Sequence, residues 1–398
     1  MAIISPSIIS TAFRSSNRVG ICRACILTLL LVCDMLAAHP AQACPFCTAL
    51  APTLCQQREG AAVTALAELE TAAAGGPATV KLHQVLVGQA VVGPQSRLTI
   101  PLDLAAERGT LLLLFGKGSA VDQLDWHALA VDETSYSYFA RAPRGEVATV
   151  DRLAYFAPYL EHANKLIAED AYLEFGHAPF DQVAAASSML SMHQVRSWLT
   201  DATVPGGRKG FYGLVLGLAR DPAVRAVNAE LLNKLILAPE DDFRAGFDGI
   251  LGGYLLLDPA SGLSLIESRY LTNPQAAVGD VRHAQAALRF YHEYGREISA
   301  RQLSLATRKL LARPEFAESA IVDLARWQDW DALPEVTSLF TKAGFAQPAV
   351  RRAVVGYLLA CPEQRARLAL ASLRALDAAG VAEAEQVLST TGSVPQAS

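Results

Sequence analysis

The spacing of apolar residues changes near residue 147, and this change limits the folds open to the chain. Before that point apolar residues alternate with polar ones over short runs, the period of two typical of β-strands. After it they recur every three or four positions, as they do in helices. The sequence therefore predicts a small β domain (44–143), an all-α domain (147–392) and a disordered tail (393–398).

Five short runs in the first part have the strand pattern and end at glycine or proline. Residues 78–87 alternate, as a half-buried strand does, and residues 109–115 are continuously apolar, as a strand buried on both faces is. Five such strands predict a small closed sheet of the OB type. Residues 61–73 also suit a helix, because alanine and glutamate favour one. The predicted strands are 61–70, 78–87, 97–100, 109–115 and 124–131.

The second part is typical of a succession of helices. Val150, Leu153 and Phe156 mark the apolar side of the first one. Breaks then recur, mostly at a residue before proline, which is pushed out of the helical region. Helix pairs recur at roughly 35–45 residues, the spacing of HEAT-type repeats, and a compact bundle is the alternative. The breaks fall at Asp201, Asp221, Asp258, Asn273, Arg313, Gln347 and Cys361.

The N-terminal segment has the features of a secretory signal peptide. Three arginines precede an apolar run over 25–38, and Ala41-Gln-Ala43 supplies the small residues of a cleavage site. We therefore expect residues 1–43 to be removed, a mature chain that starts at Cys44, and a secreted or periplasmic location. The alternative is a retained signal anchor; after cleavage we expect no membrane segment.

Composition excludes one class of partner. Removal of three arginines and Asp34 with the signal peptide changes the net charge from −5 to −7. Nucleic-acid binding needs clustered Lys and Arg, so this acidic balance argues against it. With 52% hydrophobic and 18% charged residues, the chain is expected to bury a large core.

The motif Cys44-Pro-Phe-Cys47 opens the mature chain, and Cys55 follows it closely. Disulfides persist outside the cytoplasm, so Cys44, Cys47 and Cys55 are disulfide candidates for a clamp at this end. Redox catalysis is the alternative, but it needs a strand before the motif. Zinc needs further ligands, and attachment of haem needs a histidine where Thr48 stands. Cys361 is expected in the core.

The chain resembles the netrin-like module of the tissue inhibitors of metalloproteinases over residues 44 to about 135. The resemblance is carried by Cys44, Cys47, the strand VKLHQVLVG and the run GTLLLLFGKG. It implies a clamped N-terminus on a small barrel, and an inhibitor that acts through the amino group of its first cysteine. In that family the opening cysteines pair with distant ones of the barrel, whereas this chain has no cysteine between Cys55 and Cys361.

Over most of its length the chain also resembles a group of uncharacterised secreted bacterial proteins. This resemblance implies the same architecture and no particular activity. The residues that carry it are CPFC at 44–47, AEDAYLEFGHAPFDQV at 168–183, GFYGLVLGL at 210–218 and DLARWQDW at 323–330.

Two glycine clusters superficially resemble phosphate-binding loops. Their spacing matches neither the dinucleotide fingerprint nor the P-loop, so we expect them to let neighbouring helices approach closely. The glycines are Gly210, Gly213, Gly217, Gly249, Gly252 and Gly253.

Acidic and histidine residues suggest no complete catalytic set. Asp170 and Glu174 share a helical face and could act as an acid–base pair if buried. Acidic residues are mostly exposed, so we expect a solvated face. His177 and His193 flank helix ends and are expected to be capping or surface residues. The sequence therefore predicts no catalytic residue and no metal site.

Arg326, Trp327 and Trp330 form the most aromatic and charged turn of the helical part. Tryptophan and arginine are enriched at interface hot spots. Burial statistics favour core packing for the two tryptophans, and an interaction surface is the second interpretation.

These observations predict a non-enzymatic extracytoplasmic scaffold that binds a protein partner and uses no cofactor. Two alternatives stay open. One is a thiol–disulfide oxidoreductase that uses Cys44 and Cys47, and the other is a protease inhibitor that acts through the mature N-terminus.

Overall fold

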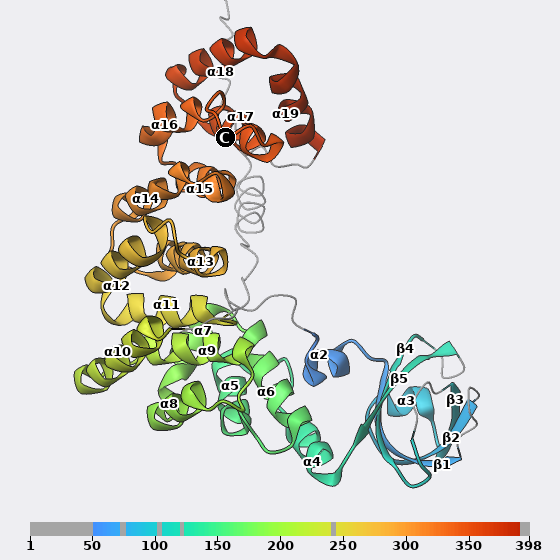
Figure 1. Ribbon diagram of the computed structural model, residues 1–398. Helices are drawn as coiled ribbons and strands as arrows, with labels where there is room; N and C mark the ends of the chain where they lie inside the picture. Colours follow the sequence, from blue (N-terminus) through green and yellow to red (C-terminus); the bar gives the residue numbers. More distant parts are fainter. Residues whose placement is uncertain (1–50, 72–76, 102–105, 120–122, 240–243, 391–398) are drawn as a thin grey trace, which may run out of the picture. The chain divides into compact units, whose positions relative to one another are not determined.

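The computed structural model describes residues 51–71, 77–101, 106–119, 123–239 and 244–390 (Figure 1). The strands are β1 (Val63–Thr71), β2 (Pro77–Val87), β3 (Arg97–Pro101), β4 (Leu111–Lys117) and β5 (Asp125–Val131). The helices are α2 (Leu54–Glu59), α3 (Gln89–Val92), α4 (Glu133–Arg141), α5 (Thr149–Phe156), α6 (Lys165–His177), α7 (Phe180–Ala186), α8 (Met192–Thr200), α9 (Gly206–Gly217), α10 (Pro222–Leu237), α11 (Phe247–Leu257), α12 (Pro259–Ile266), α13 (Val278–Tyr294), α14 (Ala300–Arg308), α15 (Pro314–Arg326), α16 (Leu333–Ser338), α17 (Pro348–Ala360), α18 (Gln364–Leu376) and α19 (Ala378–Thr390).

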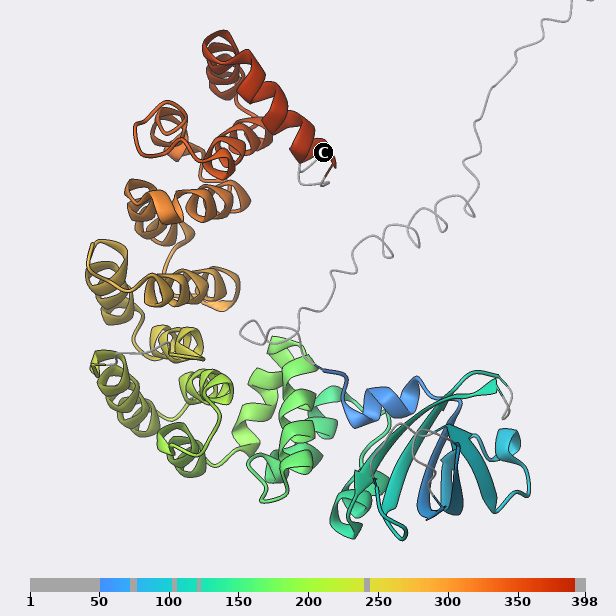
Figure 2. The same ribbon diagram turned by 45° about the vertical axis from the view of Figure 1, so that its right-hand side comes forward.

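The five strands form one antiparallel sheet in the order β3-β2-β1-β4-β5. The sheet curves into a half-barrel with β3 and β5 at its edges (Figure 2). The predicted strands are confirmed, but the predicted closed sheet is corrected, because no pairing joins β3 to β5 among the residues described. The alternative of a helix over 61–73 is wrong, since β1 pairs with β2 from Thr64 to Thr71 and with β4 from Val63 to Glu68.

Strand β4 is buried on both faces, as its continuous apolar run predicts. Leu112 and Leu114 pack inside the half-barrel with Val80. Leu113 and Phe115 point the other way and join a core formed mainly by helices. Because successive side chains point to opposite faces of a strand, β4 contributes residues to both cores.

Helical structure begins earlier than the apolar period predicts. Helix α2 precedes the sheet and starts with a capping box between Thr53 and Gln56. Helix α4 follows β5 directly, and the Asp132 side chain accepts a hydrogen bond from the backbone N–H of Ser135. Both helices are short, so their caps are a stronger signal than their periodicity.

From α9 onward the helices lie in two layers (Figure 1). Helices α9, α11, α13, α15, α17 and α19 form one layer, and the even-numbered helices between them form the other. Several helices start with proline after a residue that ends the preceding segment: Asp258, for example, ends α11 and caps α12. No strand occurs within 133–239 or 244–390.

The glycine clusters pack α9 against α11, which confirms the interpretation that they serve helix packing. A Cβ placed on Gly253 would lie 2.1 Å from the carbonyl oxygen of Gly213. A Cβ on Gly249 would lie 2.1 Å from the carbonyl oxygen of Gly210. Only a hydrogen at these positions lets the two backbones approach so closely.

Candidate functional site

Helix α15 ends in a turn, residues 326–331, that carries the predicted tryptophans. The N–H of Gln328 donates to the carbonyl of Ala325, and the N–H of Asp329 donates to the carbonyl of Leu324 at 2.9 Å. These two bonds form a Schellman motif, whose left-handed position is usually glycine. Here Gln328 occupies it with a φ of 56°. Such a conformation costs a non-glycine residue about 1 kcal/mol.

The two tryptophans anchor this turn to helices on either side. Trp327 stacks on His292 of α13, with ring centroids 4.3 Å apart and planes 5° from parallel. Trp330 meets Tyr357 of α17 edge to face at 5.2 Å. Both indole rings are half-buried. Their packing between helices agrees with the core interpretation, while part of each ring remains at the surface.

Polar contacts hold the same turn. The Arg308 guanidinium makes a bidentate pair with the Asp329 carboxylate, at 2.7 Å from Nε to Oδ2. Tyr357 donates its hydroxyl to the carbonyl of Asp329, and Arg365 donates to the carbonyl of Trp330 at 3.0 Å. Bidentate arginine pairs fix geometry as well as charge. Hydrogen bonds therefore fix the backbone of the turn at three consecutive residues: Gln328 through the Schellman motif, Asp329 through Tyr357, and Trp330 through Arg365.

Arg326, Gln328 and Asp331 are the exposed side chains of this turn. They lie beside two half-buried indole rings on a backbone that is already fixed. Such an arrangement offers charge and aromatic area to a partner with little loss of conformational entropy. We call residues 326–331 the tryptophan turn.

Asp170 and Glu174 do not form a solvated face. Asp170 is 3% exposed and Glu174 is 4% exposed, so the expectation is wrong. Asp170 Oδ1 accepts the backbone N–H of Leu54 at 2.7 Å, and Oδ2 accepts the hydroxyl of Tyr138 at 2.7 Å. Burial raises the pKa of Asp170 to about 6, against the opposing effect of these two hydrogen bonds. This carboxyl joins α2, α4 and α6.

Glu174 pairs with α5. Its Oε2 accepts a 2.7 Å hydrogen bond from Nη2 of Arg152, and the Cys55 thiol is a further side-chain hydrogen-bond partner of this carboxylate. Nε of Arg152 has no hydrogen-bond partner among the residues described. A buried donor without an acceptor is costly, so the pairing of Arg152 is incomplete.

Cys55 lies beside this carboxylate as a free, buried thiol. Burial, followed by the negative charge of Glu174, raises the pKa of the Cys55 thiol well above its usual range. Nη2 of Arg58 contacts its sulfur at 3.6 Å and donates to the carbonyl of Pro143 at 2.6 Å. A thiol with a raised pKa is a poor nucleophile. Cys44 and Cys47 lie outside the described residues, so the clamp stays a prediction.

The predicted surface histidines differ in role. Nε2 of His177 lies 2.9 Å from the carbonyl oxygen of Ala51 and fixes the start of the described chain on α6. His193 is exposed in α8. Cys361 is buried, as predicted for a core residue.

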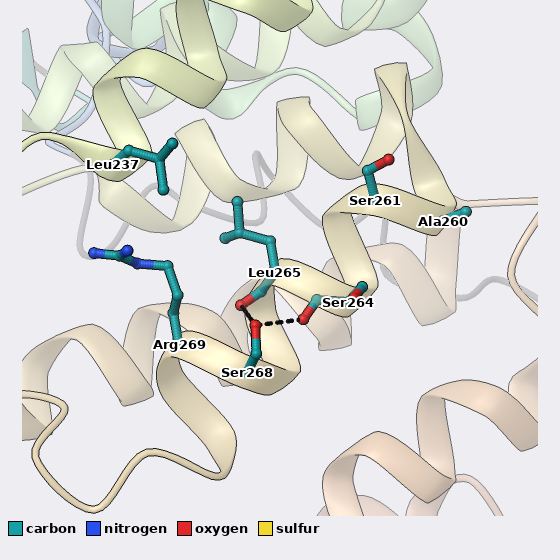
Figure 3. A pocket seen from close by; sticks show the side chains of 7 residues that line it. All are labelled: Leu237, Ala260, Ser261, Ser264, Leu265, Ser268 and Arg269. Atoms are coloured by element: carbon teal, nitrogen blue, oxygen red, sulfur yellow. Dashed lines mark hydrogen bonds between the residues drawn. The ribbon is translucent and has the colours of Figure 1, made fainter.

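A hollow of about 610 Å³ between the end of α10 and α12 is open to solvent (Figure 3). The Ser268 hydroxyl donates to the carbonyl of Ser264 at 2.8 Å, so it is used within its own helix. Arg269 is the titratable residue of this hollow. No acid, base and nucleophile converge here. The lining residues are Leu237, Ala260, Ser261, Ser264, Leu265, Ser268 and Arg269.

Two further classes of site are absent from the part of the chain that the structure describes. It holds no group of three His, Cys, Asp or Glu side chains arranged to bind a metal ion. None of its helices combines the length and the apolar character needed to cross a bilayer.

The fold defines the class of this protein as an antiparallel half-barrel followed by layered helices. No family model matches the chain, and no curated protein matches it. A solved structure that aligns with it is that of human deoxyhypusine hydroxylase in complex with glycerol, at 16% identity and a TM-score of 0.26, over 59% of this chain and 82% of that one. At this score the likeness carries no conclusion about fold or activity.

Proposed function

We propose that this chain is a non-enzymatic extracytoplasmic scaffold that binds a protein partner through the tryptophan turn. The observation that carries the proposal is the combination of a fixed backbone with the exposed side chains of Arg326 and Gln328. Strain at Gln328 persists because the bonds around it hold the turn. Strained, well-supported turns are often kept for function.

The helical part, in this proposal, consists of degenerate HEAT-like repeats, and the half-barrel is of the OB type. Two features support the repeat assignment. Odd-numbered helices lie in one layer and even-numbered helices in the other. Polar contacts also join neighbouring repeats: Arg289 of α13 pairs with Asp323 of α15 at 2.7 Å, and Arg244, in the turn before α11, pairs with Asp280 of α13 at 2.6 Å. Stacked repeats offer extended surfaces to partner proteins.

The buried Cys55 thiol, with its raised pKa, is not a candidate nucleophile for thiol chemistry. Catalysis by the described residues is not favoured either. Two acids that line a second hollow beside α12 are used locally: Asp258 caps α12, and Glu267 pairs with Lys309 at 2.6 Å.

The experiment is affinity capture from the extracytoplasmic fraction of the native host. Wild-type protein is compared with Arg326→Glu and with the matched control Arg282→Glu, which reverses an exposed arginine on α13. Equal thermal unfolding midpoints must first show that all three proteins are folded.

We expect wild type and Arg282→Glu to retain the same partner, and Arg326→Glu to lose at least nine-tenths of it. This expectation follows because reversing a charge in an interface places like charges together. Retention of one set of proteins by all three baits would contradict the proposal.

A further inference from the structure

Helix α18 leaves two leucines open to solvent on the side away from the core. Leu376 is 70% exposed and Leu368 is 61% exposed, the highest values among the large hydrophobic side chains of the described residues. They lie eight positions apart, on one side of the helix and about two turns from each other. The exposed residues between them on this side are small. We call this surface the leucine face; it consists of Leu368, Ala371, Ser372, Ala375 and Leu376.

The opposite side of α18 fixes this orientation. Ala366, Leu370 and Leu373 are buried there, and α18 packs beside α17 and α19 (Figure 1). Turning the leucine face inward would expose these three side chains in exchange. The helix has 13 residues, too few to cross a bilayer, so an apolar surface that covers the leucine face meets the helix from the side.

The charge of α18 is unlike that of the rest of the chain. The helix contains three arginines and no acidic residue, whereas the whole chain has a net charge of −5. Arg367 is exposed, and its Nη2 donates to the carbonyl of Pro362 at 3.4 Å. No carboxylate among the described residues lies within ion-pair distance of this guanidinium, so its positive charge is uncompensated.

The other two arginines pair with acids but stay accessible. Arg365 pairs with Glu363, and Arg374 pairs with Glu385. Both arginine side chains remain about half-exposed, and exposed ion pairs are weak. At 100° per residue, Arg367 and Arg374 flank one edge of the leucine face and Arg365 flanks the other. A negative surface laid on this face would therefore meet positive charge on both sides of the leucines.

Charge and area together select the occupant of the leucine face. A second copy would bring the arginines of two α18 helices along one seam, and like charges repel. A stable interface with a protein needs about 800 Å² on each partner, and two leucines separated by alanines and a serine offer far less. A lipid surface needs no such area, because separate side chains can enter it. Anionic lipids also attract arginine.

We propose that the leucine face of α18 binds the surface of an anionic membrane. Leu368 and Leu376 enter the boundary between headgroups and acyl chains, while Arg365, Arg367 and Arg374 contact lipid phosphate groups. The contact is lateral and reversible, because two leucines are a weak anchor. Binding here does not require a protein partner at the tryptophan turn.

The test is co-sedimentation of the protein, purified from the native host, with vesicles of phosphatidylglycerol and phosphatidylcholine in equal parts. Vesicles of phosphatidylcholine alone are the uncharged control. Leu368→Ser combined with Leu376→Ser removes the apolar contact. Leu237→Ser combined with Leu305→Ser is the matched control, because these exposed leucines lie on α10 and α14.

A second pair of variants tests the charge. Arg367→Glu reverses the uncompensated arginine, and Arg282→Glu reverses an exposed arginine on α13 as its control. Arg326→Glu separates this surface from the tryptophan turn. Equal thermal unfolding midpoints must first show that all variants are folded.

We expect the protein to bind the vesicles with phosphatidylglycerol at least about tenfold more strongly than those without it. The change of both leucines in α18 should lower the partition constant at least about tenfold, since the apolar contact is lost, and its matched control should leave the constant unchanged. Arg367→Glu should lower the constant about fivefold or more, because each basic residue near an anionic surface contributes about that factor. Arg282→Glu and Arg326→Glu should have no effect.

Equal binding by the two leucine variants would overturn the proposal, as would equal binding to both kinds of vesicle or to neither. Sedimentation velocity without vesicles covers the other occupant. A wild-type dimer that the change of Leu368 and Leu376 abolishes would also overturn the proposal, because it would assign the leucine face to a second copy of the chain.

Discussion

The backbone N–H of Leu54 donates a 2.7 Å hydrogen bond to Oδ1 of Asp170, 116 positions further along the chain. The other oxygen of the same carboxyl accepts the hydroxyl of Tyr138. Helix α2 is therefore fixed on α6 by a buried acidic residue. This contact is independent of any disulfide.

Removing the Asp170 carboxyl should destabilise the chain strongly. Asp170→Ala leaves the Leu54 N–H and the Tyr138 hydroxyl buried without acceptors, at a cost of about 2–4 kcal/mol. Urea unfolding measures this loss. Asp151→Ala, at an exposed aspartate of α5, should change the free energy of unfolding by no more than about 0.5 kcal/mol. Equal effects of the two substitutions would contradict the role of Asp170.

Asp170 should also make stability depend on pH. Its pKa is raised from 3.8 to about 6 in the folded chain, so between these values the folded state holds more protons than the unfolded state. The free energy of unfolding therefore falls as pH rises through this window, by at most about 3 kcal/mol from this group.

Urea unfolding of wild type and Asp170→Asn from pH 4 to pH 7 isolates this contribution. The difference between the two proteins should change mainly between about pH 4 and pH 6, because asparagine does not titrate. A constant difference over this range would show that the pKa of Asp170 is not raised.

Cys55 should be unreactive in the folded protein. Its thiol is buried and its pKa is raised, so the thiolate, the form that attacks an alkylating reagent, is scarce. Iodoacetamide at pH 8 should label Cys55 only after denaturation, as peptide mass spectrometry can show. Rapid labelling of native Cys55 would contradict its placement. The same spectra report whether Cys44 and Cys47 are joined, as the predicted clamp requires.

Adding a single methyl group at the contact between α9 and α11 should destabilise the chain. Gly253→Ala would place a Cβ 2.1 Å from the carbonyl oxygen of Gly213, so we expect a loss of about 2–3 kcal/mol. Gly207→Ala is the matched control, since its Cβ would meet nothing within 4 Å. It should be neutral or stabilise the chain by up to about 1 kcal/mol. Both are measured by urea unfolding.

Local sequence patterns predicted most of the strands and helices, but few of the hydrogen bonds and ion pairs between buried side chains. Alternation and turn residues predicted the five strands, because each depends on a few adjacent residues. Closure of the sheet depends on pairing between β3 and β5, which are distant in sequence, and it was predicted wrongly. Helices α2 and α4 were missed because six to nine residues give too few periods to recognise.

The sequence of α6 contains a pattern that indicates the burial of Asp170 and Glu174. Helix α6 has apolar residues on all sides, including Ile167, Tyr172 and Phe175, and a helix that is apolar all round is buried. Asp170 and Glu174 are buried with it, whereas Glu169 of the same helix is exposed. By contrast, the partners of Asp170 lie on α2 and α4, so no local pattern could identify them.

Composition located the tryptophan turn, but it did not predict the contacts that hold the turn in place. The stack of Trp327 on His292 and the pairing of Arg308 with Asp329 join residues 21 to 35 positions apart. Only the folded chain shows that the aromatic rings serve packing while Arg326 stays exposed.

Site-specific photo-crosslinking tests the central claim, binding of a protein partner at the tryptophan turn, most directly. A photoreactive amino acid at position 331 stands beside Arg326 and Gln328, and the same amino acid at position 318 is the control on the exposed side of α15. We predict one protein adduct from position 331 that Arg326→Glu removes and Arg282→Glu retains. Absence of an adduct at 331, or the same adduct from 318, would contradict the account.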